Sequence, residues 1–366
     1  MKKYLSTLKY KHYNTKHAEQ QLLSKLRFKK QKRLERRQFQ NIARHYPIPS
    51  IKKNKHKYWD YNEVIAPSDF SFLYNTEEVI SFVNEIVDYH KKRKKVWVRL
   101  RDVIHIDYGA IVVLLSIMVQ FKSQGIDFNG DKPRNVEANR LLYKSGFLYN
   151  LFFRDEERYS IGSEKNFDIH THAWKDVDAQ LGEKIITEAS QTVWNEKRRC
   201  QGVQRAFIEL MQNTNNHAVI GKEGEKHWWL SVHHNKEDKT VTFSFVDFGV
   251  GIFTNLNNKP ESSKFHNWLK KLTGHFTFKN NAELLKLILE GKLHLTVTGK
   301  HFRGKGLPGI AEVQKRNQIS NLHIVTNDVR YNVSQDEYKL LMQNFNGTFI
   351  SWEIGVHNES CKYNNN

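Results

Sequence analysis

An acidic residue followed by two glycines closes an alternating stretch of the sequence. Asp247 ends a strand predicted at residues 240–246, and Gly249 and Gly251 follow it at two-residue intervals. The apolar residues on one side of this strand are Val241, Phe243 and Phe245. Glycines let the backbone approach a flat ligand, while the carboxylate accepts a hydrogen bond from an exocyclic amine. Asp-x-Gly-x-Gly is also a common turn, so this element alone does not indicate a ligand.

A second glycine cluster lies nearer the C-terminus, at the predicted start of a helix. It contains Gly304, Lys305, Gly306 and Gly309, and Pro308 suits the first helical position because its missing N–H is not needed there. Free N–H groups at a glycine-rich helix start hold phosphate, and a lysine adds a positive charge. The cluster therefore indicates a phosphate-binding turn.

The same residues allow a rival interpretation. Residues 299–305 match the glycine and lysine spacing of a P-loop, with residues 293–297 as its strand. The next residue is Gly306, whereas a P-loop carries a serine or threonine that holds Mg²⁺. The missing hydroxyl favours the first interpretation.

A polar stripe lies on a helix that is otherwise apolar. Glu209, Asn213 and His217 are four residues apart, so they fall one turn above another on one face. The face that seats this helix on a core carries Val203, Phe207, Leu210 and Met211. A solvated helix face would explain any one of the three polar residues; the stripe together with the glycine elements predicts a site.

Further elements must position these residues, and the patterns predict them as follows. A long helix covers residues 176–197, and a hairpin joins residues 228–233 to 240–246. A connection of about residues 253–303 has the length of a lid. The remaining predicted elements are helices at residues 264–272 and 282–289 and strands at 322–326 and 348–354.

The helix stripe, Asp-x-Gly-x-Gly, the glycine cluster and Asn-Gly-Thr-Phe at residues 346–349 occur in an order that resembles the ATP-binding domain of the GHKL superfamily (gyrase, chaperone, histidine kinase and MutL ATPases). The resemblance spans about residues 176–354 and implies an α+β fold, the two-layer α/β sandwich of Bergerat type. The family usually has Gly-x-Gly-Leu-Gly, whereas Pro308 here precedes the last glycine.

The resemblance implies a role for each residue, with ATP and Mg²⁺ as ligands. Glu209 acts as general base, which requires a carboxylate within reach of the attacking oxygen. Asn213 holds Mg²⁺, which neutralises charge on the phosphates. Asp247 accepts from the adenine amino group, Thr348 supports the adenine, and His217 either packs the helix or binds ligand. The remaining ATP-binding residues are Gly249, Gly251, Gly304, Lys305, Gly306 and Gly309.

Residues 96–151 resemble a STAS domain, the fold of bacterial anti-sigma-factor antagonists. A helix at 76–92, a strand at 96–100 and an apolar helix at 110–124 predict a small α/β layer. The resemblance depends on Ile-Asp-Tyr-Gly-Ala at residues 106–110 and on a final helix at 135–146. That family carries a phosphorylated serine or threonine after the aspartate. Tyr108 and Gly109 take its place, which favours a docking or scaffolding role.

The net charge of +19 is concentrated at the N-terminus. Residues 1–60 carry 18 lysines and arginines against three acidic residues, interspersed with aromatic side chains. Such an arm neutralises nucleic-acid phosphates and stacks on bases; the alternative is a solvated tail that contacts acidic protein or lipid surfaces. We expect RNA or DNA contact without sequence specificity.

The remaining composition favours a cytoplasmic protein. Two cysteines, Cys200 and Cys361, give no disulfide framework, and the apolar run at residues 110–121 is too short to cross a bilayer. The N-terminus has no apolar signal core. His170 and His172 lack further ligands in register, so we reject a metal site there.

The sequence thus predicts an arm (residues 1–60), a STAS-like domain (61–155) and an ATP-binding domain (156–366). We expect a Mg²⁺-dependent ATPase switch. The alternatives are a serine/threonine protein kinase of the anti-sigma-factor type, whose Glu-x-x-x-Asn-x-x-x-His pattern is the most similar, and a nucleic-acid-binding protein with a regulatory ATP site. The resemblance also allows a homodimer and a protein partner bound through the STAS-like domain.

Overall fold

The structure is a computed structural model that describes residues 17, 20–27, 29–30, 33–34, 60–148, 169–173, 179–217, 227–248, 251–252, 280–292 and 306–359. At residues 169–173, 213–217, 227 and 306 only the backbone is described. The chain divides into two compact units, residues 1–50 and 51–366. The protein is mixed α/β, with both parallel and antiparallel sheets.

The first unit contains the basic arm. Its described residues are helical, as the composition predicted, and their side chains are exposed. The exposed leucines of this helix are Leu22, Leu23, Leu26 and Leu34. Among the described residues of the whole chain, no helix is long and apolar enough to cross a membrane.

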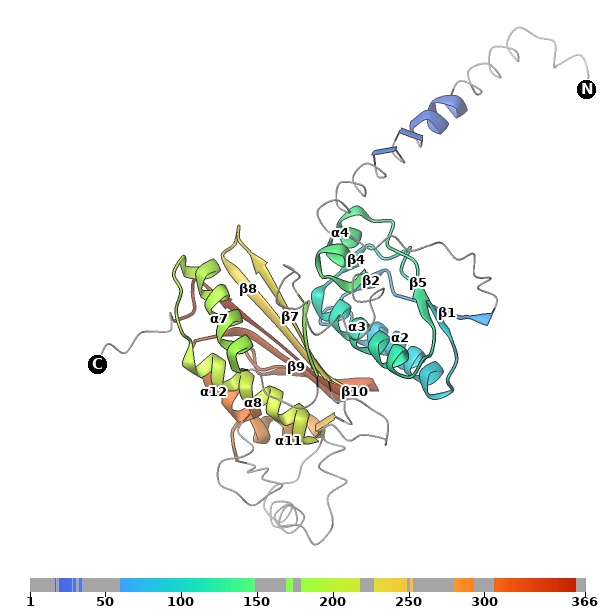
Figure 1. Cartoon of the computed structure of the whole chain (residues 1–366). Coiled ribbons are helices and arrows are strands. Elements are labelled where there is room, and N and C mark those ends of the chain that lie inside the picture. The colour runs from blue at the N-terminus through green and yellow to red at the C-terminus, as the bar shows by residue number, and fades with distance from the viewer. Residues whose placement is uncertain are drawn as a thin grey trace, which may run out of the picture. The chain divides into compact units, whose positions relative to one another are not determined.

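The second unit begins with an α/β layer that we call the N-terminal α/β region (residues 60–148). Its three-stranded parallel sheet has the order β1-β3-β5 (Asn62–Ile65, Val96–Arg99 and Phe128–Gly130). The strands β2 (Asp69–Phe70) and β4 (His105–Ile106) form a separate, two-stranded parallel sheet. The helices are α2 (Thr76–Lys91), α3 (Tyr108–Ser123) and α4 (Val136–Lys144) (Figure 1).

Helix α3 is buried on nearly all sides, because its sequence is apolar all round rather than on one stripe. Asp107 caps its N-terminus and accepts a hydrogen bond from the Ala110 N–H at 2.6 Å. The other oxygen of Asp107 accepts from the Phe72 N–H at 2.9 Å. One carboxylate therefore joins the start of α3 to the loop that contains Phe72.

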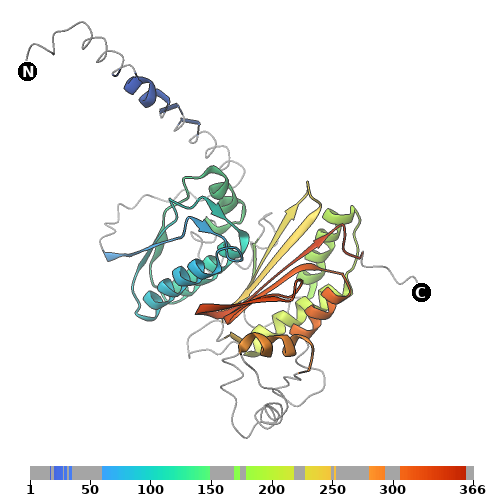
Figure 2. The ribbon, with the colours of Figure 1, turned by 180° about the vertical axis from the view of Figure 1, so that it is seen from behind.

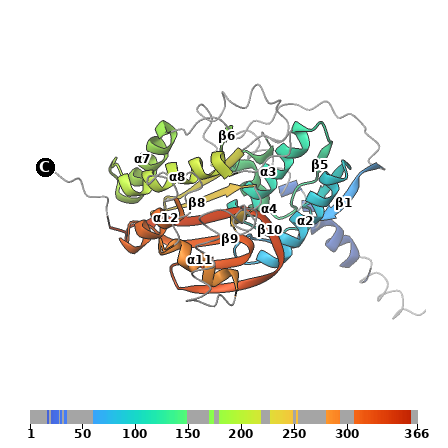
Figure 3. The same ribbon diagram turned by 90° about the horizontal axis from the view of Figure 1, so that it is seen from below.

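The rest of the second unit is built on a five-stranded sheet of order β6-β7-β8-β10-β9. All of its neighbouring strands are antiparallel. The strands are β6 (Ile169–Ala173), β7 (His227–Asn235), β8 (Thr240–Asp247), β9 (Ser320–Asn332) and β10 (Glu337–Gly355). The helices are α7 (Ala179–Trp194), α8 (Gln201–His217), α11 (Asn281–Leu289) and α12 (Gly306–Lys315). Figure 3 shows these helices together on one side of the strands.

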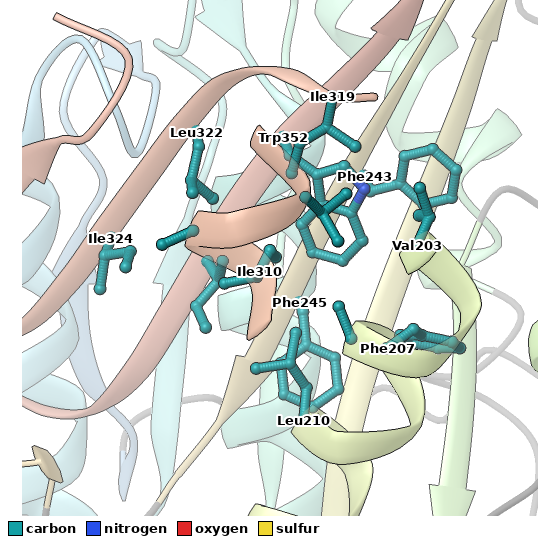
Figure 4. Packing of buried hydrophobic residues seen from close by; sticks show 14 of the residues in the cluster. Val203, Phe207, Leu210, Phe243, Phe245, Ile310, Ile319, Leu322, Ile324 and Trp352 are labelled. Carbon is teal, nitrogen blue, oxygen red and sulfur yellow. The ribbon is translucent and has the colours of Figure 1, made fainter. Parts of the chain in front are cut away.

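The helix-covered face of this sheet holds the main hydrophobic core. Because side chains alternate along a strand, every second residue of each central strand faces the helices. In Figure 4, Phe207 and Leu210 of α8 and Ile310 of α12 lie over this face. The Phe243 and Trp352 rings stack at 5.1 Å between β8 and β10. The sheet residues of this core are Trp228, Leu230, Val232, Val241, Phe243, Phe245, Leu322, Ile324, Val329, Tyr331, Ile350, Trp352 and Ile354.

The opposite face of the same sheet is covered by the N-terminal α/β region. Helix α3 packs on β7 and β8, and α2 packs on β10. The Tyr108 and His233 rings stack at 4.5 Å, and the Phe72 and Phe349 rings lie 4.6 Å apart. Figure 2 shows the sheet from behind, where β10 is the reddest of its strands. The second unit therefore places helices on both faces of the antiparallel sheet.

Most predicted elements of the second unit are present within a few residues of their predicted bounds. They include the hairpin of β7 and β8, the long helix α7 and the helix at α11. The strands β1, β2, β4 and β6 were not predicted, and only residues 322–326 of β9 and 348–354 of β10 were predicted. Pro308 occupies the third position of α12 rather than the first. Cys200 is buried and disulfide-bonded, whereas no disulfide framework was expected from the sequence.

The stability of the protein should depend on pH through the buried carboxyl of Asp107. Loss of hydration raises the pKa of its carboxyl from 3.8 to about 6, although hydrogen bonds from the backbone of Ala110, Phe72 and Leu73 lower it. Folding therefore favours the protonated form: this contribution to stability is fully present below about pH 3.8 and is lost as the pH rises through about 6. Its size is at most about 3 kcal/mol.

The test compares urea unfolding of the wild type and Asp107→Asn between pH 4.5 and 7. Asparagine is neutral throughout, so the difference in unfolding free energy between the two proteins should change with pH as the wild-type carboxyl titrates. A difference that stays constant over this range would contradict the assignment.

Candidate functional site

Three polar residues replace the apolar core at one end of the sheet. Asp247 of β8 is paired with Thr348 of β10, which is paired in turn with Thr326 of β9. The residues two positions away, Phe245 and Ile350, face the helix-covered core. Because side chains alternate along a strand, all three polar side chains also belong to this face. Asp247, Thr348 and Thr326 therefore form a row of polar residues at the edge of the hydrophobic core.

Hydrogen bonds hold this polar row together. The Thr348 N–H donates to Asp247 Oδ1 at 3.2 Å. The Thr326 hydroxyl donates to the Gly347 carbonyl oxygen at 3.0 Å and accepts from the Ile252 N–H at 3.1 Å. The chain that leaves β8 after Asp247 thus reaches β9 at Thr326 within a few residues.

Two glycines make these approaches possible. A Cβ at Gly347 would overlap the Asp247 carbonyl oxygen. Gly251 has a φ of +76° and lies against the Asn327 side chain, where a Cβ would overlap as well. Gly251, which was predicted as a ligand residue, lies against Asn327 of β9.

Glu209 occupies a second polar position, on α8. The Arg205 Nε–H donates to Glu209 Oε1 at 3.0 Å; the Arg205 side chain is 70% exposed and the Glu209 side chain 17%. Within the described part of the chain, Glu209 Oε2 is buried and has no hydrogen-bond partner. A Cβ built on Gly309 would lie 3.5 Å from this oxygen. The first turn of α12 therefore lies against the unpaired oxygen.

Helix α8 runs toward the polar end of the sheet. In Figure 4, Val203 lies near Phe243. One turn later, the Phe207 ring is 5.7 Å from Trp228, whose strand partner is Asp247. The last turns of α8, which include Asn213 and His217, continue in this direction.

Helix α12 is antiparallel to α8. Gly309 lies beside Glu209, whereas Val313, one turn later, lies 3.5 Å from a Cβ built on Gly202 near the start of α8. The N-terminal end of α12 therefore meets the central part of α8, and its free N–H groups give that end a partial positive charge. A hollow of about 450 Å³ runs along α8 and is lined by Gln201, Gln204, Arg205, Ile208, Glu209 and Gln212.

The structure brings the predicted residues together in two groups. Asp247 and Thr348 are hydrogen-bonded at the strand ends, where Gly251 contacts Asn327 of β9, and Glu209 meets Gly309 between α8 and α12. Asn213, His217 and Gly306 belong to described helices, but their side-chain surroundings lie outside the description. Gly249, Gly304 and Lys305, the P-loop alternative and most of the predicted lid lie outside the described residues.

Sequence reasoning missed Thr326, Asn327 and Arg205. Thr326 continues the alternation of Leu322 and Ile324, so its position on the core face was readable once a strand was assigned there. Arg205 precedes Glu209 by four residues, the spacing of a helical ion pair. The contact of Asn327 with Gly251 had no local signal.

No model of a known protein family matches the chain, and no curated protein matches it either. Among the described residues, no group of three histidine, cysteine or acidic side chains could hold a metal ion. The interpretation of the site therefore depends on its residues and their geometry.

Gly347→Ala should destabilise the protein. The new methyl group would overlap the backbone oxygen of Asp247, so the end of the β8–β10 pair must shift, at a cost of about 1–3 kcal/mol. Gly309→Ala is the matched control, since its Cβ has ordinary contact distances and alanine favours a helix by up to about 1 kcal/mol. Urea unfolding measures both; equal stability of Gly347→Ala and wild type would contradict the close approach.

Proposed function

We propose that this protein binds ATP between the polar strand ends and helices α8 and α12, and hydrolyses it as a switch of the GHKL type. The proposal is supported by one observation above others: among the described residues, Glu209 Oε2 is a buried acceptor without a hydrogen-bond partner, and it lies against the first turn of α12. A buried unpaired carboxylate oxygen costs stability, and a ligand that supplies a donor and phosphate explains why the site retains it.

The adenine end of the proposed site is the polar row. Asp247 already accepts from the Thr348 N–H through Oδ1, which fixes the orientation of the carboxylate. A carboxylate held in this way accepts a hydrogen bond from the adenine amino group. Thr348 and Thr326 add hydroxyls at the same margin of an apolar core, against which a purine ring packs.

The phosphate end is the start of α12. Its N–H groups and partial positive charge suit phosphate oxygens. Glu209, beside this turn, takes a proton from the attacking water as general base, while the Arg205 ion pair keeps the carboxylate in place. Mg²⁺, when bound, neutralises charge on the phosphates, and Asn213, four residues after Glu209 on α8, is the residue that we assign to hold it.

Several features of the fold support the family assignment. An antiparallel sheet with α7, α8, α11 and α12 on one of its faces suits the two-layer ATP-binding sandwich, and the parallel β1-β3-β5 sheet with its helices suits a STAS-like domain. Tyr108 and Gly109 take the place of the phosphorylated hydroxyl of STAS proteins, and Gly109 is buried against Phe349. This arrangement favours a structural role for the domain over that of a phosphate acceptor.

A protein kinase acting on a separate protein is the alternative from the same site. Labelled ATP offered with candidate STAS proteins distinguishes the two activities. Phosphate released to solution supports the ATPase, and phosphate on the partner supports the kinase.

The exposed cations of the arm favour a nucleic-acid contact as a second function. Lys25, Arg27, Lys29, Lys30 and Arg33 are all exposed on the described helix. Each neutralised phosphate releases counterions, so binding of RNA or DNA should weaken steeply with salt. Loss of this binding on deletion of residues 1–50 would support the assignment.

Glu209→Gln should abolish hydrolysis and preserve ATP binding. Glutamine keeps an acceptor for Arg205 but cannot take a proton, so kcat should fall by about 10²–10⁴ while Kd for ATP changes little. Phosphate release and calorimetry measure the two quantities. Glu312→Gln is the matched control, because Glu312 also forms an i,i+4 ion pair, with Arg316 at 3.0 Å. Hydrolysis that survives in Glu209→Gln would remove the assigned base.

Asp247→Asn should exchange the preferred base. Asparagine keeps an oxygen for the Thr348 N–H and replaces the other oxygen with an NH₂ donor, which suits the O6 acceptor of guanine. ATP affinity should fall about 10- to 100-fold, and GTP should bind more tightly than it does to wild type. Titration of both nucleotides in the presence of Mg²⁺ measures the change. An unchanged ATP affinity would show that Asp247 does not contact the base.

A further inference from the structure

Consecutive residues of β10 serve opposite faces of the sheet. Thr348 belongs to the polar row with Asp247, on the helix-covered face. Phe349 follows it and faces the N-terminal α/β region, where it is fully buried. Any displacement of the Phe349 backbone therefore moves Thr348, whose N–H orients the Asp247 carboxylate.

The Phe349 ring is tightly enclosed. Its centroid lies 4.6 Å from that of Phe72, and a Cβ built on Gly109 would lie 3.0 Å from Phe349 Cζ. Phe72 also contacts Phe345, with ring centroids 5.2 Å apart. We call Phe72, Gly109 and Phe345 the Phe349 socket. Gly109 is in the first turn of α3, where only the absence of a side chain lets the ring approach so closely.

The two walls of the socket that belong to the N-terminal α/β region are joined to each other. Asp107 accepts from the Phe72 N–H through one oxygen and from the Ala110 N–H, next to Gly109, through the other. The loop of Phe72 and the start of α3 are thus held as one piece. Because the Phe72 loop and the start of α3 cannot move apart, a shift of either one displaces the Phe349 ring.

The same region also holds β10 at a second place. Lys339 forms an ion pair with Glu77 at 3.5 Å, and the Met342 N–H donates to the same carboxylate. The Asn84 side chain donates to the Asn344 carbonyl oxygen at 3.0 Å. Helix α2 therefore fixes the part of β10 that leads into residues 345–349.

From these contacts we propose that the N-terminal α/β region sets the geometry of the nucleotide site through Phe349. Phe349 is a positioning residue: it contacts no nucleotide, and it fixes the Thr348 N–H that orients Asp247. This inference rests on the proposed ATP site for its effect on affinity. Its effect on the backbone at Thr348 does not depend on any ligand.

The test uses the full chain with a methyl group added to the socket. Gly109→Ala should favour α3 by itself, but its methyl group would lie 3.0 Å from Phe349 Cζ and 3.3 Å from Asp107 Oδ1, so its closest neighbour, the Phe349 ring, must give way. Amide hydrogen exchange of residues 347–349 should become at least 10-fold faster, and KM for ATP should rise about 10-fold with kcat unchanged, because Glu209 is untouched.

Val96→Ala is the matched control. Val96 is buried in β3 of the same region, away from the five-stranded sheet, and its truncation should lower the melting temperature without affecting exchange at residues 347–349. Phe349→Leu is a second variant that enlarges the socket, and it replaces Gly109→Ala if that protein does not fold. It should also speed exchange and raise KM.

The outcomes separate this inference from the proposed function. Faster exchange at residues 347–349 in the socket variants but not in Val96→Ala supports the positioning role even if wild type binds no nucleotide, a result that would defeat the ATP proposal alone. Exchange and KM that match those of Val96→Ala would overturn the positioning role and leave the ATP site standing.

Discussion

The alternation of side chains along β10 is the constraint on which the rest of the structure depends. A strand presents successive residues to opposite faces, and both faces of this strand are covered. Ile350 and Trp352 enter the core under the helices, and Phe349 enters the socket beneath the N-terminal α/β region. Slipping the register by one residue would reverse every one of these side chains. The polar row at Asp247 is therefore specified by the packing of its apolar neighbours.

The elements that follow a local pattern were predictable from the sequence. The hairpin of β7 and β8 was found from alternation, and the helix that carries Glu209 was found from apolar residues at helical spacing. Strand β6 was not found, because its residues, Ile-His-Thr-His-Ala, alternate too weakly to indicate a strand. The short strand β1 follows the basic arm in the sequence, and the many charged residues before it hid the alternation of polar and apolar residues.

The site was predictable in composition but only partly in geometry. Asp247 and Thr348 were selected as separate elements, and their pairing depends on strands that are 101 residues apart in the chain. The contact of Gly251 with Asn327 depends on the backbone of β9, because Asn327 itself has a φ of +48°. Long-range contacts of this kind leave no mark on a local window of sequence. The burial of Glu209 Oε2 against Gly309 likewise required the packing of α8 on α12.

The socket also bears on how the two regions of the second unit work together. A surface used for exchange of partners is exposed for part of the time, and its contacts are polar and loosely packed. The Phe349 socket is apolar, leaves only a tight 3.0 Å approach between a methyl group at Gly109 and the ring, and is closed on one side by a capped helix. Opening it would expose Phe72 and Phe349, each fully buried, at a cost of about 1.5–3 kcal/mol per ring. The N-terminal α/β region is therefore better suited to remain on the sheet than to exchange partners at this surface. Under the proposed ATPase function, a partner that responds to the nucleotide would then contact another surface, and the hollow along α8, which includes Glu209, is the most direct one.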